Sequence, residues 1–154
     1  MNTILVAIDF SSVTRRVVSE AVRLARLTKA RIVLVHIIQM PVIVTEPYKF
    51  PLGNVAEYML EAEKATDRHL ARLGTKLRAG GILTETVRST GLPSYSILRL
   101  ARKRAASYIV LGSHGHSAVF DVLVGSTARG VLKRATCPVV VVPASKPPSG
   151  KAKR

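Results

Sequence analysis

The chain contains little cysteine and few aromatic residues. Its 154 residues include one cysteine, Cys137, and no tryptophan, and aromatic residues make up 5% of the total. A single cysteine cannot form an internal disulfide, which excludes a disulfide-stabilised fold and favours a reducing, cytoplasmic location. The scarcity of aromatic side chains also argues against binding of single-stranded nucleic acid by base stacking.

Long apolar runs are lacking as well. None approaches the roughly 18–20 residues that span a bilayer. The start, MNTILVAIDF, has no basic segment, and Asp9 interrupts its apolar run, so no secretory signal is expected. Hydrophobic residues nevertheless make up 47% of the chain, which excludes wholesale disorder and suits one domain with a real core.

Acidic residues are scarce. Nine Asp and Glu face 24 Lys and Arg, which gives a formal net charge of +15. A field of this sign attracts phosphates, nucleic acid or anionic lipid. Helix-dipole complementarity accounts for one cation per helix end, and three in succession favour weak polyanion binding at one pole. The residues expected at that pole, where helices lead into strands, are Lys29, Arg31, Arg78, Arg102, Lys103, Arg104, Lys133 and Arg134.

Apolar strand patterns alternate with helical patterns along the chain. This alternation predicts a three-layer α/β fold with a parallel sheet and right-handed crossovers. A serine at 11 or 12 is the expected cap of the first helix, and Asn54 with Glu57 resembles a capping box for the second. The expected strands are Thr3–Ile8, Arg31–Ile38, 83–89, 108–111 and 138–142, and the expected helices are 12–28, 54–79, 93–104 and 124–135.

The most informative stretch is 107–136, SYIVLGSHGHSAVFDVLVGSTARGVLKRAT. A short strand leads into a loop with Gly112 and Gly115, and Gly125-Ser126-Thr127 then opens a helix. Glycines let backbone N–H groups turn toward an anion, and a helix N-terminus adds unpaired donors. Two such features after one strand predict a nucleotide phosphate site. Asp9 ends the first strand and would face the ribose or adenine if the two strands are neighbours.

With these residues identified, the chain resembles the universal stress proteins of the nucleotide-binding kind. Gly112, Gly115, Gly125 and Ser126 match the family pattern G-x₂-G-x₉-G-[S/T], and ILVAIDFSS and LVHII match the other half of its site. The resemblance covers residue 1 to about 144, the expected domain. Residues 145–154 are expected to form a basic, disordered tail. The chain departs from the family in carrying Ala7, where relatives often have proline, and in its high positive charge.

The resemblance implies a doubly wound, Rossmann-like single domain of the adenine nucleotide alpha hydrolase type, with strand order 3-2-1-4-5. It implies ATP as ligand, with magnesium accompanying the triphosphate, and a homodimer formed partly through Val139–Val142. Asp9 would contact the ribose, and backbone at Ala7 and Ile37 the adenine. The phosphates would lie at Leu111, Gly112, Gly115, Gly125, Ser126 and Thr127.

No catalytic residue is predicted. The chain has no Walker A sequence, nucleophile elbow or helical H-E-x-x-H, and no phosphate-gripping lysine, acid pair and base form a set. Nucleotide binding by a stress or signalling module is therefore favoured over catalysis, with a slow ATPase and a nucleotide-independent polyanion binder as alternatives. Two interpretations of the segment 40–53 are equally favoured: a lid that closes over the nucleotide, or a loop on the surface.

The histidines and the cysteine are given structural interpretations. His114 and His116 alternate in a loop without cysteine or glutamate partners, so no zinc site is expected. His36 is interpreted as an interior histidine and His69 as a packing or surface residue. Cys137 is interpreted as a small buried hydrophobic residue.

Overall fold

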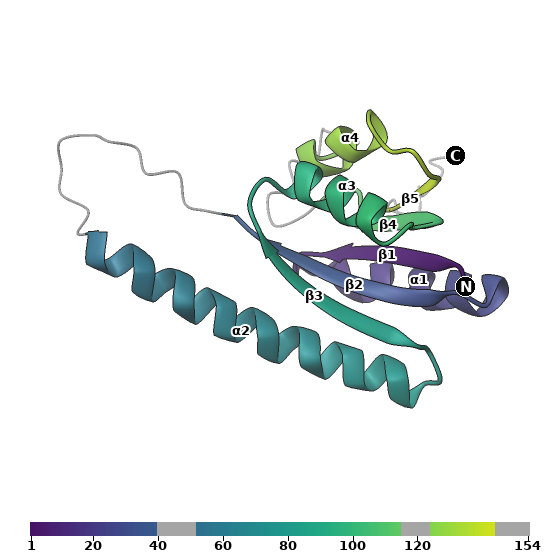
Figure 1. The fold of residues 1–154 in the computed structure, drawn as a ribbon, viewed down its shortest axis with the longest axis horizontal. Coiled ribbons are helices and arrows are strands. Elements are labelled where there is room, and N and C mark those ends of the chain that lie inside the picture. The colour runs from purple at the N-terminus through teal and green to yellow at the C-terminus, as the bar shows by residue number, and fades with distance from the viewer. Residues whose placement is uncertain (40–51, 115–123, 144–154) are drawn as a thin grey trace, which may run out of the picture.

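A computed structural model of the chain describes residues 1–39, 52–114 and 124–143. Five parallel strands form one sheet in the order β3-β2-β1-β4-β5, which confirms the expected topology (Figure 1). The strands are β1 (Thr3–Ile8), β2 (Arg31–Ile38), β3 (Thr84–Thr90), β4 (Tyr108–Gly112) and β5 (Val139–Val142). The helices are α1 (Thr14–Thr28), α2 (Leu52–Ala79), α3 (Pro93–Lys103) and α4 (Ser126–Leu132).

The helices cover both faces of the sheet, so the fold has three layers. α1 and α2 lie on one face and α3 and α4 on the other (Figure 1). Because successive strand residues point to opposite faces, Ile4 and Val6 of β1 pack toward α1 and α2, whereas Leu5 packs toward α3 and α4. β1 is therefore apolar on both sides, as expected of a central parallel strand.

The predicted serine cap of α1 is wrong. The helix begins at Thr14, and Val13 at its N-cap makes no side-chain capping hydrogen bond. The hydroxyl of Ser11 instead donates to Asp9 Oδ1 over 2.6 Å, and the Ser11 N–H donates to the same oxygen over 3.0 Å. The serine is thus engaged in the turn that leaves β1 and does not cap the helix.

The capping box predicted at Asn54 is also wrong, because α2 begins at Leu52 and Asn54 lies within its first turn. A capping residue needs a non-helical backbone, which a position inside the helix does not have. The helix ends at Ala79, before the predicted Gly80-Gly81 stop, where Gly81 has φ +79°. Its inner stripe is as predicted: Thr66, Leu70 and Leu77 are buried, and Leu73 is half-buried.

Other features of the sequence analysis lie outside the described residues. These are the larger part of the segment 40–53, Gly115 and His116, and the C-terminal residues from 144 onward. Within the described ranges, no helix combines the length and the apolar character needed to cross a membrane.

Candidate functional site

A cavity of about 780 Å³ opens at the C-terminal ends of β1, β2 and β4. The chain runs from β1 outward through β2 to β3 and then returns to β4, on the other side of β1. Strand order therefore reverses between β1 and β4. In open α/β sheets, the crevice at such a reversal is where ligands bind.

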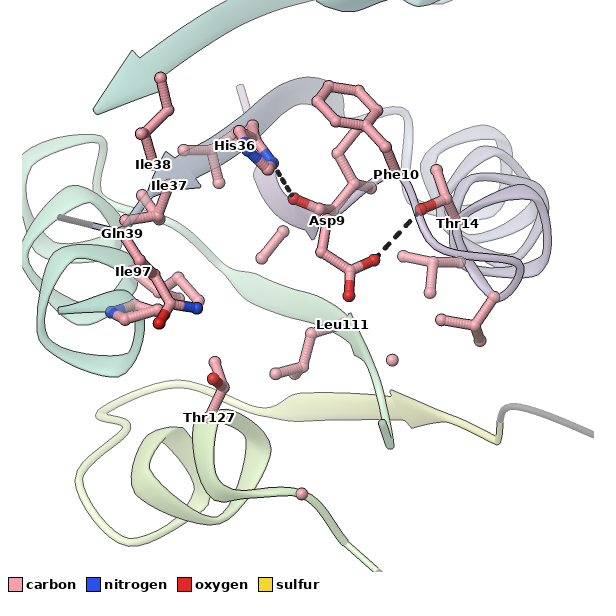
Figure 2. A pocket seen from close by; sticks show the side chains of 18 of the residues that line it. Asp9, Phe10, Thr14, His36, Ile37, Ile38, Gln39, Ile97, Leu111 and Thr127 are labelled. Atoms are coloured by element: carbon pink, nitrogen blue, oxygen red, sulfur yellow. Dashed lines mark hydrogen bonds between the residues drawn. The ribbon is translucent and has the colours of Figure 1, made fainter. Parts of the chain in front are cut away.

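The cavity gathers residues from both halves of the predicted site. Figure 2 shows Asp9, Ile37, Leu111 and Thr127 around it, contributed by three strand ends and by the start of α4. Gly115 lies outside the described residues. The predicted site residues that line the cavity are Ala7, Asp9, Ile37, Leu111, Gly112, Gly125, Ser126 and Thr127.

Asp9 is held in a defined orientation at the end of β1. Its Oδ1 accepts the N–H and the hydroxyl of Ser11. The hydroxyl of Thr14 donates to the same oxygen over 3.4 Å (Figure 2). These contacts form the turn between β1 and α1. The same carboxylate lines the cavity, so a turn role and a ligand-binding role are compatible for Asp9.

The glycines allow the backbone to approach closely around the cavity. A Cβ at Gly112 would lie 2.8 Å from Val13 Cγ1, and one at Gly125 would lie 3.1 Å from the carbonyl oxygen of Ser113. The Gly125 N–H donates to that carbonyl over 2.7 Å, so this donor is used within the protein. Gly125 therefore brings the start of α4 against the end of β4.

The first turn of α4 faces the cavity with its N–H groups. Arg129 is the first residue whose N–H bonds back to the turn, donating to the Gly125 carbonyl over 3.0 Å. The N–H groups of Ser126, Thr127 and Ala128 have no intrahelical acceptor, as at any helix start. All three residues line the cavity, so these donors and the positive end of the helix dipole suit an anion there.

A cluster of three rings on the cavity wall was missed by the sequence analysis. The ring of Phe10 contacts those of His36 and His69 in tilted arrangements, with centroids 4.5 and 5.0 Å away, and all three residues line the cavity. His36 Nδ1 donates to the carbonyl of Ile8 over 2.9 Å, which agrees with its interpretation as an interior residue. Phe10 has φ +60°, a left-handed conformation that is uncommon for a residue with a side chain.

Helix α2 forms a second wall that was not predicted. Its 28 residues span about 42 Å, whereas the eight residues of β2 span about 26 Å, so its N-terminal part overhangs the strand ends (Figure 1). Tyr58, Ala62, Thr66 and His69 line the cavity from this overhang. Their spacing indicated that they share one face of the helix, but nothing in the sequence indicated that this face would line the cavity.

The described lining contains no lysine or arginine, and Asp9 is its one acidic residue. No group of His, Cys, Asp or Glu among the described residues is arranged to hold a metal ion. His114 lines the cavity, with Nδ1 3.2 Å from the hydroxyl of Ser113. Cys137 is half-buried away from this cavity, and burial raises the pKa of its thiol.

Together these features define a doubly wound α/β protein with a ligand cavity at its topological switch point. The sequence matches the family model of the universal stress protein family over residues 1–143, and the chain belongs to that family. It is 30% identical over 145 residues to universal stress protein YxiE of Bacillus subtilis, covering 92% of this chain and 98% of that protein.

Solved structures agree with this assignment. Universal stress protein UspA from Lactobacillus plantarum superposes with a TM-score of 0.77 at 27% identity, covering 92% of this chain and 97% of that chain. A universal stress protein in complex with cAMP superposes with a TM-score of 0.64 at 20% identity, covering 94% and 98%. The Archaeoglobus fulgidus protein in complex with dAMP gives 0.61 at 23%, covering 92% and 97%. At these lower identities the similarity establishes the fold.

Proposed function

We propose that this chain binds an adenine nucleotide, ATP, in the switch-point cavity and acts as a nucleotide-responsive stress or signalling module. The observation that carries the proposal is the convergence on one cavity of every described residue that was chosen from the sequence pattern. Its volume of about 780 Å³ lies within the range typical of small-molecule sites. The cAMP and dAMP complexes of proteins with the same fold support an adenine ligand.

In the proposed arrangement the adenine lies against the backbone at Ala7 and Ile37, and the ribose lies near Asp9. The phosphates take N–H groups around Gly112 and Gly115 and at Ser126 and Thr127. Leu111 lines the cavity beneath the nucleotide. Gly125 allows the start of α4 to approach the end of β4 closely. Because the described lining has no Lys or Arg, backbone donors, the helix dipole and a magnesium ion would balance the phosphate charge.

Magnesium fits the donors that are present. It prefers oxygen ligands and is usually held by one or two carboxylates together with substrate phosphates and water. Asp9 supplies a carboxylate, and Ser126 and Thr127 supply hydroxyls in the same cavity. When bound, the ion would neutralise phosphate charge, and the protein would contribute the orientation of its ligands.

The proposal is binding without efficient turnover. Rapid phosphoryl transfer needs a phosphate-gripping cation, metal-binding acids and a positioned base. The sequence offers no identifiable set of these groups, so we expect any ATP hydrolysis to be slow. The proposed response is a population shift, in which nucleotide contacts order the cavity rim and change the surface offered to a partner.

We further propose that residues 1–144 form the nucleotide-binding unit, that it works in the cytoplasm, and that it is a homodimer paired through β5. β5 is an edge strand of four valines, and Val139, Val140 and Val141 are only half-buried in one chain. An apolar edge with unpaired backbone groups invites a second strand. A two-fold pairing of these edges would cover it. The polyanion-binding alternative concerns a different surface, the pole at which the C-terminal ends of the helices lie.

The first test is to denature the purified protein and identify released nucleotide by mass spectrometry. We expect ATP from the unaltered chain and a large loss in Asp9→Ala and Gly115→Val. Glu20→Ala, which removes an exposed acid of α1 outside the cavity, should retain it. A parallel readout is thermal unfolding with Mg-ATP, where free ligand at about 100 times Kd stabilises by about 2.7 kcal/mol. The proposal is refuted if the denatured protein releases no nucleotide and if added Mg-ATP does not bind.

A further inference from the structure

The layer formed by α3 and α4 carries basic side chains and no acidic ones. Residues 86–114 and 124–143 contain no Asp or Glu at all. The two helices lie side by side on one face of the sheet (Figure 1). They pack closely, because a Cβ at Gly130 would lie 2.8 Å from Ser94 Cβ. The exposed basic residues of this layer, here the α3–α4 face, are Arg99, Arg102, Lys103, Arg129, Lys133 and Arg134.

The opposite layer is different in charge. Most of the acids in the described ranges lie on α1 and α2, where they pair with neighbouring cations. Glu20 contacts Arg23 over 2.9 Å, and Glu61 contacts Lys64 over 3.3 Å. Arg88 of β3 also reaches this layer, contacting Glu63 and Asp67, which raise its pKa. Charge is therefore mixed on one side of the sheet and of one sign on the other.

The structure also corrects the composition of the basic pole predicted from the sequence. Arg31 and Arg104 both contact the carboxylate of Glu85, and Arg78 donates to the backbone carbonyl of Thr84 over 3.1 Å. These three cations are engaged by the protein itself. Exposed cations also lie on α1, among them Arg15, Arg16 and Arg26, but the α3–α4 face is the described layer on which six exposed cations occur without an acidic residue.

We propose that the α3–α4 face binds the phosphate backbone of duplex nucleic acid without reading its sequence. Four of the six exposed cations are arginines, whose planar guanidinium groups bind phosphate oxygens in pairs. Arg99 and Lys103, and likewise Arg129 and Lys133, are spaced four residues apart and form a row on each helix. α3 is about 16 Å long, and a duplex carries one charge per about 1.7 Å, so several phosphates fall within reach.

A lipid surface fits this face less well. Interfacial binding needs apolar side chains that enter the membrane beside the cations. Among the described residues, the large apolar side chain exposed beside these cations is that of Leu132, at 47% exposure. Leu92 and Tyr95 are exposed at the other end of α3, next to Pro93, which lines the nucleotide cavity. The cations therefore have little apolar area among them, and attraction to phosphate dominates.

The test compares two charge-reversal triples of the full chain. Arg99→Glu/Lys103→Glu/Lys133→Glu changes the α3–α4 face. Arg15→Glu/Arg16→Glu/Arg26→Glu changes exposed residues of α1 on the opposite layer and lowers the net charge equally. Binding to a fluorescent DNA duplex of arbitrary sequence is measured between about 50 and 200 mM salt, a range in which phosphate contacts dominate the affinity.

We expect the face variant to bind about a hundred-fold more weakly at the lowest salt and to lower the slope of log K against log salt by about 3. The α1 variant should stay close to the unaltered chain. Stabilisation by Mg-ATP should be unchanged in both, because neither triple touches the cavity. If the reversed charges prevent folding, the same positions changed to glutamine give the same comparison.

Three results would overturn the proposal. Equal losses in both triples would mean that net charge alone attracts DNA. If the face variant binds DNA fully and removal of residues 144–154 abolishes binding, the DNA site lies in the C-terminal residues. Binding to phosphatidylglycerol vesicles with none to DNA would assign the face to membranes.

Discussion

At the scale of single residues, Gln39 is the polar group most suited to distinguish one base from another. It follows β2 and extends into the cavity near Ile97 (Figure 2). Its amide offers a donor and an acceptor, the combination presented by the edge of adenine. We expect Gln39→Leu to weaken ATP binding by up to about tenfold, since a neutral hydrogen bond contributes about 0.5–1.5 kcal/mol. Calorimetric titration with ATP and with GTP measures this.

The matched control is Asn2→Leu, which removes an exposed amide at the opposite end of β1. It should leave both affinities unchanged. If Gln39→Leu binds ATP and GTP as the unaltered chain does, Gln39 does not contact the base.

At the scale of elements, β5 pairs with β4 on one side and, among the described strands, with none on the other. The Ile109 N–H donates to the Pro138 carbonyl, and the Ser113 N–H donates to the Val142 carbonyl. In a parallel ladder this alternation turns the N–H of Val140 toward β4 and that of Val141 outward. Val141→Pro therefore removes an outward donor while the contacts to β4 remain. We expect a folded monomer, observed by sedimentation velocity with circular dichroism as the check on folding.

Val140→Pro is the contrasting variant, since it removes a donor that β4 needs, and it should destabilise the fold itself. A dimer that persists in Val141→Pro would place the self-association elsewhere on the chain.

At the scale of the whole molecule, the net charge of +15 opposes the compact state through self-repulsion. Salt at about 0.15 M screens charges more than about 8 Å apart. We expect the midpoint of thermal unfolding, measured by calorimetry, to rise by a few degrees between about 0.01 and 0.15 M NaCl. The rise should be smaller in the α3–α4 face triple, whose net charge is lower. A midpoint that falls with salt would mean that the ion pairs of α1, α2 and β3 outweigh the repulsion.

The sequence by itself determined the order of strands and helices, because apolar runs and glycine stops depend on neighbouring residues. Thr3–Ile8 and Arg31–Ile38 were predicted with their observed bounds. It also indicated the cavity residues near Asp9 and Gly125, because strand ends and glycine-rich turns have local signatures. The predicted α1 cap was wrong because neither serine caps the helix: Ser11 bonds to Asp9 in the turn, and Val13 occupies the N-cap.

Tertiary structure alone decided which distant residues meet. The ring contacts of Phe10 with His36 and His69 join the turn after β1 to β2 and α2, and no local pattern specifies such contacts. The same holds for charge: Arg31 and Arg104 both contact the carboxylate of Glu85 because adjacent elements bring them together. The gathering of six exposed cations on the α3–α4 face followed from the crossovers that place those two helices on one side of the sheet.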